Sequence, residues 1–350
     1  MKIAVYSIAK NEEKFVERWA KSAKDADYIL LADTGSTDRT VEIAESLGIK
    51  VYNIKVDPWR FDDARNASLA LLPADVDYCI PLDLDEVLTG NWRDVLEREF
   101  ARGITRPRYK FIWSWKPNGE PDVQFYGDKI HARSGFRWKH PVHEVVVSTG
   151  IPQIESFSTD LEIHHLPDSS KSRSLYFPLL KLSVEEDPQN DRNAYYYARE
   201  LFYNQQYSEA IKEFERFLTL SKWDAERAAA YRFMAKCTDD FEQKEKYLFD
   251  SLGEVERRET FLDLAFLYYH RQEWELCLGN IKRLLDITER PMDYISEAAA
   301  WDGTPYDVGA VAAYHNGFIG LSIEWTEKAL EYSPDDERLK ANLEFLEVPA

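Results

Sequence analysis

The first 88 residues alternate short apolar runs with stretches of helical periodicity, and this alternation constrains the fold more than any other feature. Apolar runs typical of strands cover residues 2–7, 28–32, 49–56 and 78–82. Between them, apolar side chains recur every three or four residues, as in an amphipathic helix. Strands and helices that alternate with short links form a parallel sheet with right-handed crossovers. The sequence therefore predicts an α/β domain in this part of the chain.

Polar clusters follow three of the four predicted strands. They are Ala9–Glu12 after the first strand, Asp33–Asp38 after the second and Asp83–Glu86 after the fourth. Open α/β sheets bind ligands beyond the carboxyl ends of their strands, where these clusters would meet. The sequence contains neither a GxGxxG nor a GxxxxGK[ST] motif, which disfavours dinucleotide and P-loop sites. We therefore expect a ligand site of another kind at this edge.

The acids that follow the fourth strand suggest a cation. If the strand stays extended to Asp85, the Asp83 and Asp85 side chains share one face and Leu84 points the other way. Two carboxylates one pleat apart offer the oxygen ligands that Mg²⁺ and Mn²⁺ prefer. The alternative is an acidic turn in which one aspartate caps a helix near Trp92.

Four segments together resemble a family 2 glycosyltransferase of the GT-A fold. They are Ser7–Glu13, Asp33–Thr40, Phe61–Asn66 and Leu82–Glu86, in that order within about the first quarter of the chain. The resemblance implies a sugar-nucleotide site with a divalent cation, Mn²⁺ or Mg²⁺, and a UDP-sugar is the expected donor. Thr34 stands where the family often has a second aspartate.

The resemblance also implies roles for single residues. Glu12 and the backbone near Ala9 would touch the nucleotide, Asp33 would bind the base, and Asp83 the ribose. Asp85 would hold the cation that bridges the diphosphate, whose developing charge a Lewis acid neutralises. Arg65 lies one turn into a predicted helix, where it could add positive charge to the site or serve as a structural partner of Asp62 or Asp83.

A base for the acceptor is expected from the segment that ends in His143-Glu144. In similar family members a Trp…His-Glu stretch lies in the acceptor cleft, and an inverting transfer needs a base for the acceptor hydroxyl. Glu144 is the first candidate, with His143 orienting it or serving instead. The alternative is a polar pair on a strand with a structural role.

A late histidine often joins the metal in GT-A enzymes, and His164 and His165 end another predicted strand. Adjacent strand residues face opposite ways, so one of the two is expected to reach the cation, and His164 is chosen. Four aromatic residues could stack on a sugar or pack in the core: Trp113, Trp115, Tyr126 and Trp138.

Composition narrows the class of protein. The 350 residues include 44 Lys and Arg against 63 Asp and Glu, a formal net charge of −19, which argues against general nucleic-acid or anionic-membrane binding. Cys79, Cys237 and Cys277 are far apart in apolar surroundings, which predicts free thiols in a reducing compartment. No apolar stretch approaches membrane-spanning length. We expect no membrane span and a cytoplasmic location.

A repeat of about 34 residues occupies the second half of the chain. The aromatic residues Tyr207, Phe241 and Trp274 open amphipathic helices at spacings of 34 and 33 residues, and Phe318 follows 44 residues later. This period with paired helices resembles tetratricopeptide repeats. We therefore predict an α/β domain over residues 1–168 and an all-α repeat domain over 169–350. The extra length before the last copy falls in residues 288–306.

These features predict a metal-dependent inverting glycosyltransferase that moves a sugar to a protein, peptide or glycan acceptor. The repeats could bind a protein segment, hold the acceptor or form a homodimer. One alternative is a nucleotidyltransferase, although its Gly- and Arg/Lys-rich loop near the N-terminus is absent. The other is a helical-repeat adaptor with an inactive transferase domain, against which the presence of Asp33, Asp83 and Asp85 argues.

Overall fold

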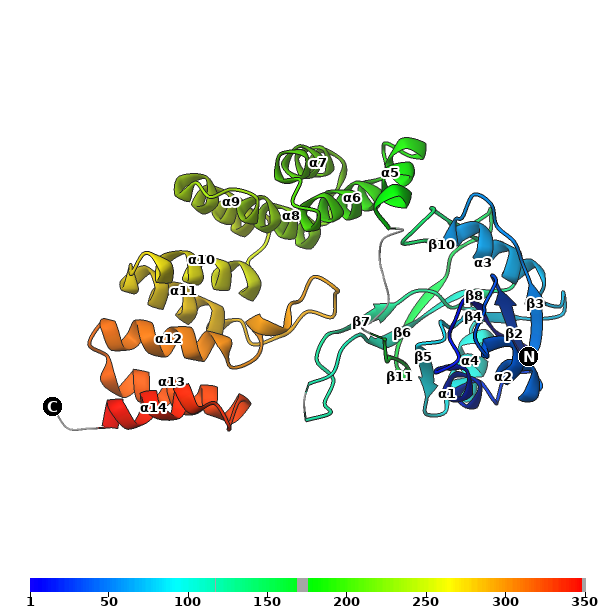
Figure 1. Cartoon of the computed structure of the whole chain (residues 1–350), viewed down its shortest axis with the longest axis horizontal. Coiled ribbons are helices and arrows are strands. Elements are labelled where there is room, and N and C mark those ends of the chain that lie inside the picture. The colour runs from blue at the N-terminus through cyan, green and yellow to red at the C-terminus, as the bar shows by residue number, and fades with distance from the viewer. Residues whose placement is uncertain (117, 169–175, 348–350) are drawn as a thin grey trace. The chain divides into compact units, whose positions relative to one another are not determined.

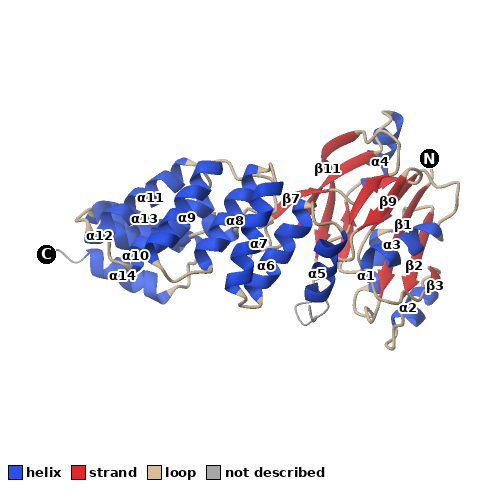
Figure 2. Ribbon diagram, turned by 90° about the horizontal axis from the view of Figure 1, so that it is seen from above, coloured by secondary structure: helices blue, strands red, loops and turns tan. Residues whose placement is uncertain are grey.

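The computed structural model describes residues 1–116, 118–168 and 176–347. The chain divides into two compact units, Met1–Glu186 and Asp187–Ala350. Within the described residues, all strands lie in the first unit, whereas the second is built from helices (Figure 2). The predicted α/β domain followed by an all-α repeat domain is confirmed. The predicted boundary at residue 168 adjoins residues 169–175, which lie outside the described part, and it stays a prediction.

The main sheet of the first unit has the strand order β3-β2-β1-β4-β8. The first four strands run parallel, and β8 pairs with β4 in the antiparallel sense. The strands are β1 (Ile3–Ala9), β2 (Tyr28–Asp33), β3 (Lys50–Asn53), β4 (Tyr78–Pro81) and β8 (His131–Ala132). Helices between them are α1 (Val16–Ser22), α2 (Thr40–Ser46) and α3 (Phe61–Ala70). All residues of β1 except the half-buried Ile8 are buried, as expected for a strand with both faces of its sheet covered.

The strand register brings the predicted polar clusters to one edge. Ala9 at the end of β1 pairs with Asp33 at the end of β2, which in turn pairs with Asn53 at the end of β3. On the other side of β1, Tyr6 pairs with Pro81, so the acids after Pro81 continue toward the same edge. Asp33 and Asp83 therefore lie at the same edge of the sheet, with β1 between their strands.

The fourth strand does not stay extended to Asp85, so the geometry expected for Asp83 and Asp85 is wrong. β4 ends at Pro81, and a turn through Leu84 and Asp85 leads into β5 (Glu86–Thr89). The turn is closed by the Glu86 amide, which donates to the Asp83 carbonyl at 2.9 Å. Asp83 and Asp85 are therefore not on one face of an extended strand, and each has its own surroundings.

A second sheet with the order β5-β11-β6-β7 adjoins this turn. Its further strands are β6 (Arg106–Ile112), β7 (Gln124–Gly127) and β11 (Glu155–His165), and β9 (Phe136–Lys139) pairs with β10 (Val145–Ser148) as a separate ribbon. Helix α4 (Trp92–Ala101) follows β5, and α5 (Tyr176–Glu186) ends the first unit. The core continues from the first sheet into the second through buried Leu82, Leu84 and Leu88.

The second unit consists of helix pairs in sequence order (Figure 1). The first helices of the pairs are α6 (Asp191–Tyr203), α8 (Asp224–Lys236), α10 (Arg258–His270) and α12 (Thr304–His315). The second helices are α7 (Tyr207–Leu220), α9 (Phe241–Glu254), α11 (Trp274–Asp286) and α13 (Ile319–Tyr332), and α14 (Glu337–Glu347) follows. The predicted repeat is confirmed, since Tyr207, Phe241 and Trp274 begin second helices and Phe318 directly precedes one.

Two further expectations can be compared with the structure. Cys79, Cys237 and Cys277 are free cysteines. In the part of the chain that the structure describes, no helix has the length and apolar character that a membrane crossing requires.

Candidate active site

The loops after β1 and β2 are tied to each other. The Asp33 carboxylate accepts backbone N–H groups of Gly35 at 3.0 Å and Ser36 at 3.0 Å, which closes the turn in which Gly35 has a φ of +104°. The Ala9 carbonyl accepts from the amide and the hydroxyl of Thr34, both at 2.9 Å. The Glu12 amide donates to the Thr40 hydroxyl at 2.7 Å. Ala9, Glu12 and Asp33, the residues predicted to touch the nucleotide, thus lie in two loops that hydrogen bonds join into one rim at the end of β1 and β2.

Arg65 on α3 is the centre of the candidate site. Its Nη2 donates to Asp83 at 2.8 Å, and its Nε pairs with Glu144. The guanidinium lies over the Trp138 ring, 4.8 Å from the ring centroid. Burial opposes its charge, but Asp83 and Glu144 outweigh burial and raise the pKa of Arg65. Arg65 thus joins the predicted ribose-binding acid to the predicted base, and its partner is Asp83 rather than Asp62.

Arg65 also has an unused donor. Its side chain is 6% exposed, and Nη1 is buried without a hydrogen-bond partner. A buried donor without an acceptor carries a cost of about 1–3 kcal/mol. An acceptor on a bound ligand would remove that cost.

Lys129, which the sequence analysis did not select, is the second cation of the cluster. Its Nζ donates to Asp83 at 2.7 Å and to Glu86 at 2.8 Å. Burial opposes ionisation of Asp83, but Arg65 and Lys129 hold the pKa of its carboxyl well below the ordinary value. For Glu86, burial is the largest effect and raises the pKa. Asp83 is therefore kept as a carboxylate, with both oxygens occupied by cationic donors.

The segment that carries Glu144 has an unusual backbone. His140 and His143 have φ angles of +85° and +50°, a region that residues other than glycine rarely adopt. The segment is held at the start of α3, where the Phe61 amide donates to the Pro141 carbonyl at 2.9 Å. Such backbone conformations persist where surrounding contacts fix them, and they cluster at functional sites. Here they accompany a carboxylate, Glu144, whose side chain is only 10% exposed.

Glu144 and His143 have different surroundings. Arg65 holds the Glu144 carboxylate in a buried ion pair. The His143 ring lies edge-on to Tyr176 of α5, with the centroids 5.6 Å apart. Arg65 is thus in a position to orient Glu144, and the expectation that His143 orients it or serves instead stays a prediction.

Of the two adjacent histidines, the structure brings His165 to Asp85. Nε2 of His165 lies 3.7 Å from the Asp85 carboxylate, whereas the His164 ring pairs with Glu162. His165 is therefore the histidine that this contact brings to Asp85, and the role of His164 at a cation stays a prediction. Side chains along β11 alternate between faces, so the two rings have different surroundings.

The contacts of the neutral His165 ring indicate its tautomer. Nδ1 lies 3.2 Å from the Trp113 carbonyl, and because a carbonyl only accepts, Nδ1 must carry the proton. In the neutral ring this leaves the lone pair on Nε2, the atom that faces Asp85. The Trp113 ring stacks on the imidazole at a centroid distance of 4.3 Å and fixes its plane. A ligating histidine typically has an arrangement of this kind.

The Asp85–His165 pair fits a divalent cation as part of a ligand set. Two ligands about 2.1 Å from an ion and roughly 90–120° apart are separated by about 3.0–3.6 Å, close to the 3.7 Å seen here. Among the described residues, no three His, Cys, Asp or Glu side chains gather closely enough to hold an ion. A cation at this pair would therefore need further ligands. Mg²⁺ sites are usually completed by substrate phosphates and water.

The four aromatic candidates separate into core and site residues. Trp138 is 2% exposed and donates from Nε1 to the Tyr6 hydroxyl at 2.8 Å, so its place is the core beneath Arg65. Tyr126 packs edge-on to Phe157. Trp115 lies edge-on to the His164 ring, with the centroids 4.6 Å apart. Trp113 is 41% exposed while it stacks on His165, so it lies beside the Asp85–His165 pair.

Part of the first unit matches a known protein family. Residues 5–131 match the family described as Glycosyl transferase family 2. The matched segment includes Asp33, Asp83 and Asp85, whereas Glu144 and His165 lie beyond it. The predicted family 2 glycosyltransferase domain is thereby confirmed for this segment.

Relatives match parts of the chain. A protein of Rickettsia bellii (strain RML369-C), named as an uncharacterized glycosyltransferase, is 40% identical over 101 residues, which are 29% of this chain and 33% of that protein. A TPR repeat-containing protein of Synechococcus elongatus is 27% identical over 149 residues, 41% of this chain and 35% of that protein. The chain thus spans about a third of the length of these curated relatives. The alignment with the crystal structure of S. aureus TarS covers 71% of this chain and 55% of the TarS chain, with a TM-score of 0.42 and 14% sequence identity.

Proposed function

We propose that this chain is a metal-dependent inverting glycosyltransferase that moves a sugar from a UDP-sugar to a hydroxyl of a protein, peptide or glycan. One observation carries the proposal. Beyond the carboxyl ends of the parallel strands, a buried Arg65 links Glu144 to Asp83. Asp85, two residues after Asp83, lies 3.7 Å from His165 at the end of β11. The family match of residues 5–131 supports a sugar-nucleotide as the donor.

The proposed base is Glu144. Its carboxylate is paired with Arg65 and therefore has a fixed direction, as a base needs if it is to accept a proton from an acceptor hydroxyl. Nη1 of Arg65 is buried without a hydrogen-bond partner, so an acceptor atom of a substrate reaches it only if binding opens the lining of the site.

On the donor side, Asp83 would bind the ribose, and Asp33 would shape the rim that receives the base. Asp85 and His165 would hold Mn²⁺ or Mg²⁺. When bound, such an ion neutralises the charge that develops on the leaving diphosphate. Each Asp83 oxygen already accepts from one cationic group, Arg65 or Lys129, and keeps a further lone pair for a ribose hydroxyl. Because these two cations already balance the charge of Asp83, the metal ion is assigned to Asp85.

A donor screen with Mn²⁺ and a nucleotide-release readout tests the proposal. We expect one UDP-sugar to give free UDP and a glycosylated acceptor. Asp85→Ala should abolish release, whereas Glu144→Gln should lower turnover by about 10²-fold or more with nucleotide binding retained. Free pyrophosphate in place of UDP would indicate a nucleotidyltransferase. Neither turnover nor a thermal shift with any donor would indicate an inactive transferase domain.

The two histidines provide a matched pair of variants. His165→Ala should weaken Mn²⁺ binding in the presence of UDP by about 10–100-fold, the usual effect of disturbing a metal's ligand environment. His164→Ala removes a ring that pairs with Glu162 and should leave the affinity unchanged. Equal losses in the two variants would contradict the assignment of His165.

A further inference from the structure

The helix pairs of the second unit are interrupted once. The links before α8 and α10 are short, residues 221–223 and 255–257, but residues 287–303 separate α11 from α12. This insertion contains one turn of 3₁₀ helix, Ala298–Ala300. It contacts the surface formed by the first helices α6, α8 and α10, which we call the inner face. In repeat arrays of this type the first helices line the concave side.

The insertion is held to the inner face by two bidentate ion pairs. Glu297 accepts from both terminal nitrogens of Arg232 on α8, at 2.9 and 3.0 Å. Asp293 accepts from both terminal nitrogens of Arg257, just before α10, at 2.8 and 3.0 Å. Both arginines are buried, with exposures of 4% and 6%. Paired arginine–carboxylate forks of this kind give direction as well as attraction.

A backbone contact and an aromatic contact complete the attachment. The buried Glu259 of α10 accepts the Glu297 amide at 3.1 Å. The Tyr294 ring stacks on Tyr196 of α6, with centroids 6.3 Å apart, and lies edge-on to Trp223 at 5.6 Å. The inner face thus recognises two acids, one aromatic ring and one backbone amide of an irregular segment.

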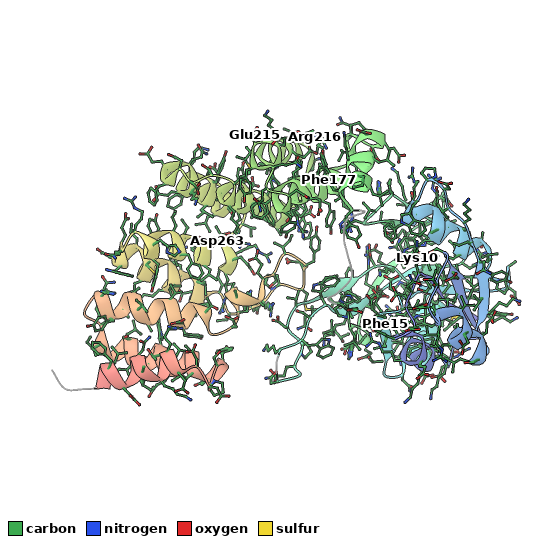
Figure 3. The ribbon with its side chains drawn as sticks, viewed as in Figure 1. Lys10, Phe15, Phe177, Glu215, Arg216 and Asp263 are labelled. Carbon is green, nitrogen blue, oxygen red and sulfur yellow. The ribbon has the colours of Figure 1, made fainter. Side chains whose placement is uncertain are left out.

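Both arginines of the inner face have a carboxylate partner outside the insertion. Arg232 has a second carboxylate partner, Asp263 of α10 (Figure 3), at 2.6 Å. Arg257 also pairs with Glu259, at 3.3 Å. In addition, α11 and α12 pack directly against each other, so the insertion is not the only connection between their pairs. On the insertion itself, the Glu297 side chain is 47% exposed and hence accessible to solvent.

We propose that the inner face of α6, α8 and α10 is a binding site for an extended acidic segment with a central aromatic residue, and that residues 287–303 are its resident occupant. The partner is a protein segment that carries an Asp-aromatic-x-x-Glu pattern like Asp293–Glu297 and displaces the insertion. The resident raises the apparent dissociation constant of such a partner, since the open face is only a fraction of the population.

A fluorescein-labelled peptide of residues 290–301 provides the probe. Its binding is followed by fluorescence anisotropy to the full chain and to a variant in which residues 289–297 are replaced by Gly-Ser-Gly-Ser. We expect the variant to bind the peptide about tenfold or more tightly than the full chain. Added salt should weaken binding, because two ion pairs are made. A peptide with Asn in place of Asp293 and Gln in place of Glu297 should not bind the variant.

Point variants separate release of the insertion from loss of the fold. Asp293→Asn with Glu297→Gln in the full chain should also increase peptide binding, whereas Glu256→Gln should not. Glu256 pairs with Arg283 in an exposed ion pair outside the inner face. Circular dichroism confirms that each variant keeps its helix content.

The proposal is overturned if the folded replacement variant binds no peptide, or if it binds the peptide no better than the full chain. It is also overturned if both the replacement and the double variant lose their helix content. In that case the insertion is a required part of the fold and not an exchangeable occupant.

Discussion

Replacing Glu226 with glutamine should stabilise the second unit in a pH-dependent way. Glu226 lies on α8 and is 5% exposed. Burial raises the pKa of Glu226 from 4.5 to about 7, with Arg192 opposing the rise and Asp191 adding to it. The native carboxyl therefore binds a proton more tightly than the same group in the unfolded chain. The free energy of unfolding consequently falls as the pH rises from 4.5 to 7.

The magnitude follows from that difference. At about 1.36 kcal/mol per pH unit, the pKa difference corresponds to about 3 kcal/mol at pH 8. Only about 1.4 kcal/mol has been lost at pH 5.5, and almost nothing at pH 4. Glutamine keeps the shape without the charge. For a unit of this size, about 3 kcal/mol corresponds to a rise in Tm of roughly 6–12 °C.

Thermal unfolding of the full chain, followed by circular dichroism at 222 nm, measures the effect. Glu226→Gln should raise the Tm of the helical transition at pH 8, by less at pH 5.5, and not at pH 4. Glu256→Gln, which neutralises an exposed carboxylate, should shift it by less than about 1 °C at each pH. A shift of Glu226→Gln that is the same at pH 4 and pH 8, or a loss of stability at pH 8, would refute the reasoning.

Two further stability predictions test the packing of each unit. Lys129→Met leaves Asp83 and the buried Glu86 without their shared cation and should lower the free energy of unfolding, measured with a chemical denaturant, by about 3 kcal/mol. An added Glu86→Gln should restore part of this loss. An unchanged free energy of unfolding in Lys129→Met would contradict the buried network. Gly309→Ala places a methyl group 2.5 Å from the Trp325 ring and should lower stability by about 1–3 kcal/mol. Gly253→Ala places its methyl group in open space on α9 and should leave stability unchanged or raise it by about 0.5 kcal/mol. Equal Tm shifts of the two variants would contradict the packing of α12 on α13.

The sheet could be predicted from the sequence because its signals are local. Buried strands appear as apolar runs, and the order of strands and helices fixes the edge at which Ala9, Asp33 and Asp83 gather. The helical repeats could also be predicted from the sequence, since their aromatic residues recur at an almost constant spacing.

The site could be predicted only in part, because its contacts depend on pairing between distant segments. Arg65 was selected, but its partner Glu144 lies 79 positions away, and no periodicity links the two. Lys129 is one lysine in a loop before β8, without a local pattern that marks it. Alternation along β11 shows that one of His164 and His165 faces Asp85, but which one depends on the register with β5.

The turn after β4 and the insertion have similar explanations. Nothing in the sequence from Leu82 to Glu86 separates a longer strand from a turn, because the next strand joins a different sheet. The extra length at residues 288–306 was visible, whereas its attachment to Arg232 and Arg257 depends on residues of earlier repeats.

Calorimetric titration of UDP into the full chain, with Mn²⁺ or with a chelator, examines most directly whether the acids at the sheet edge bind a nucleotide through a cation. Heat of binding should appear with Mn²⁺ and nearly vanish with the chelator, and Asp85→Asn should weaken the Mn²⁺-dependent affinity by about tenfold or more. UDP uptake of equal strength with and without the ion, or unchanged in Asp85→Asn, would contradict the proposed site.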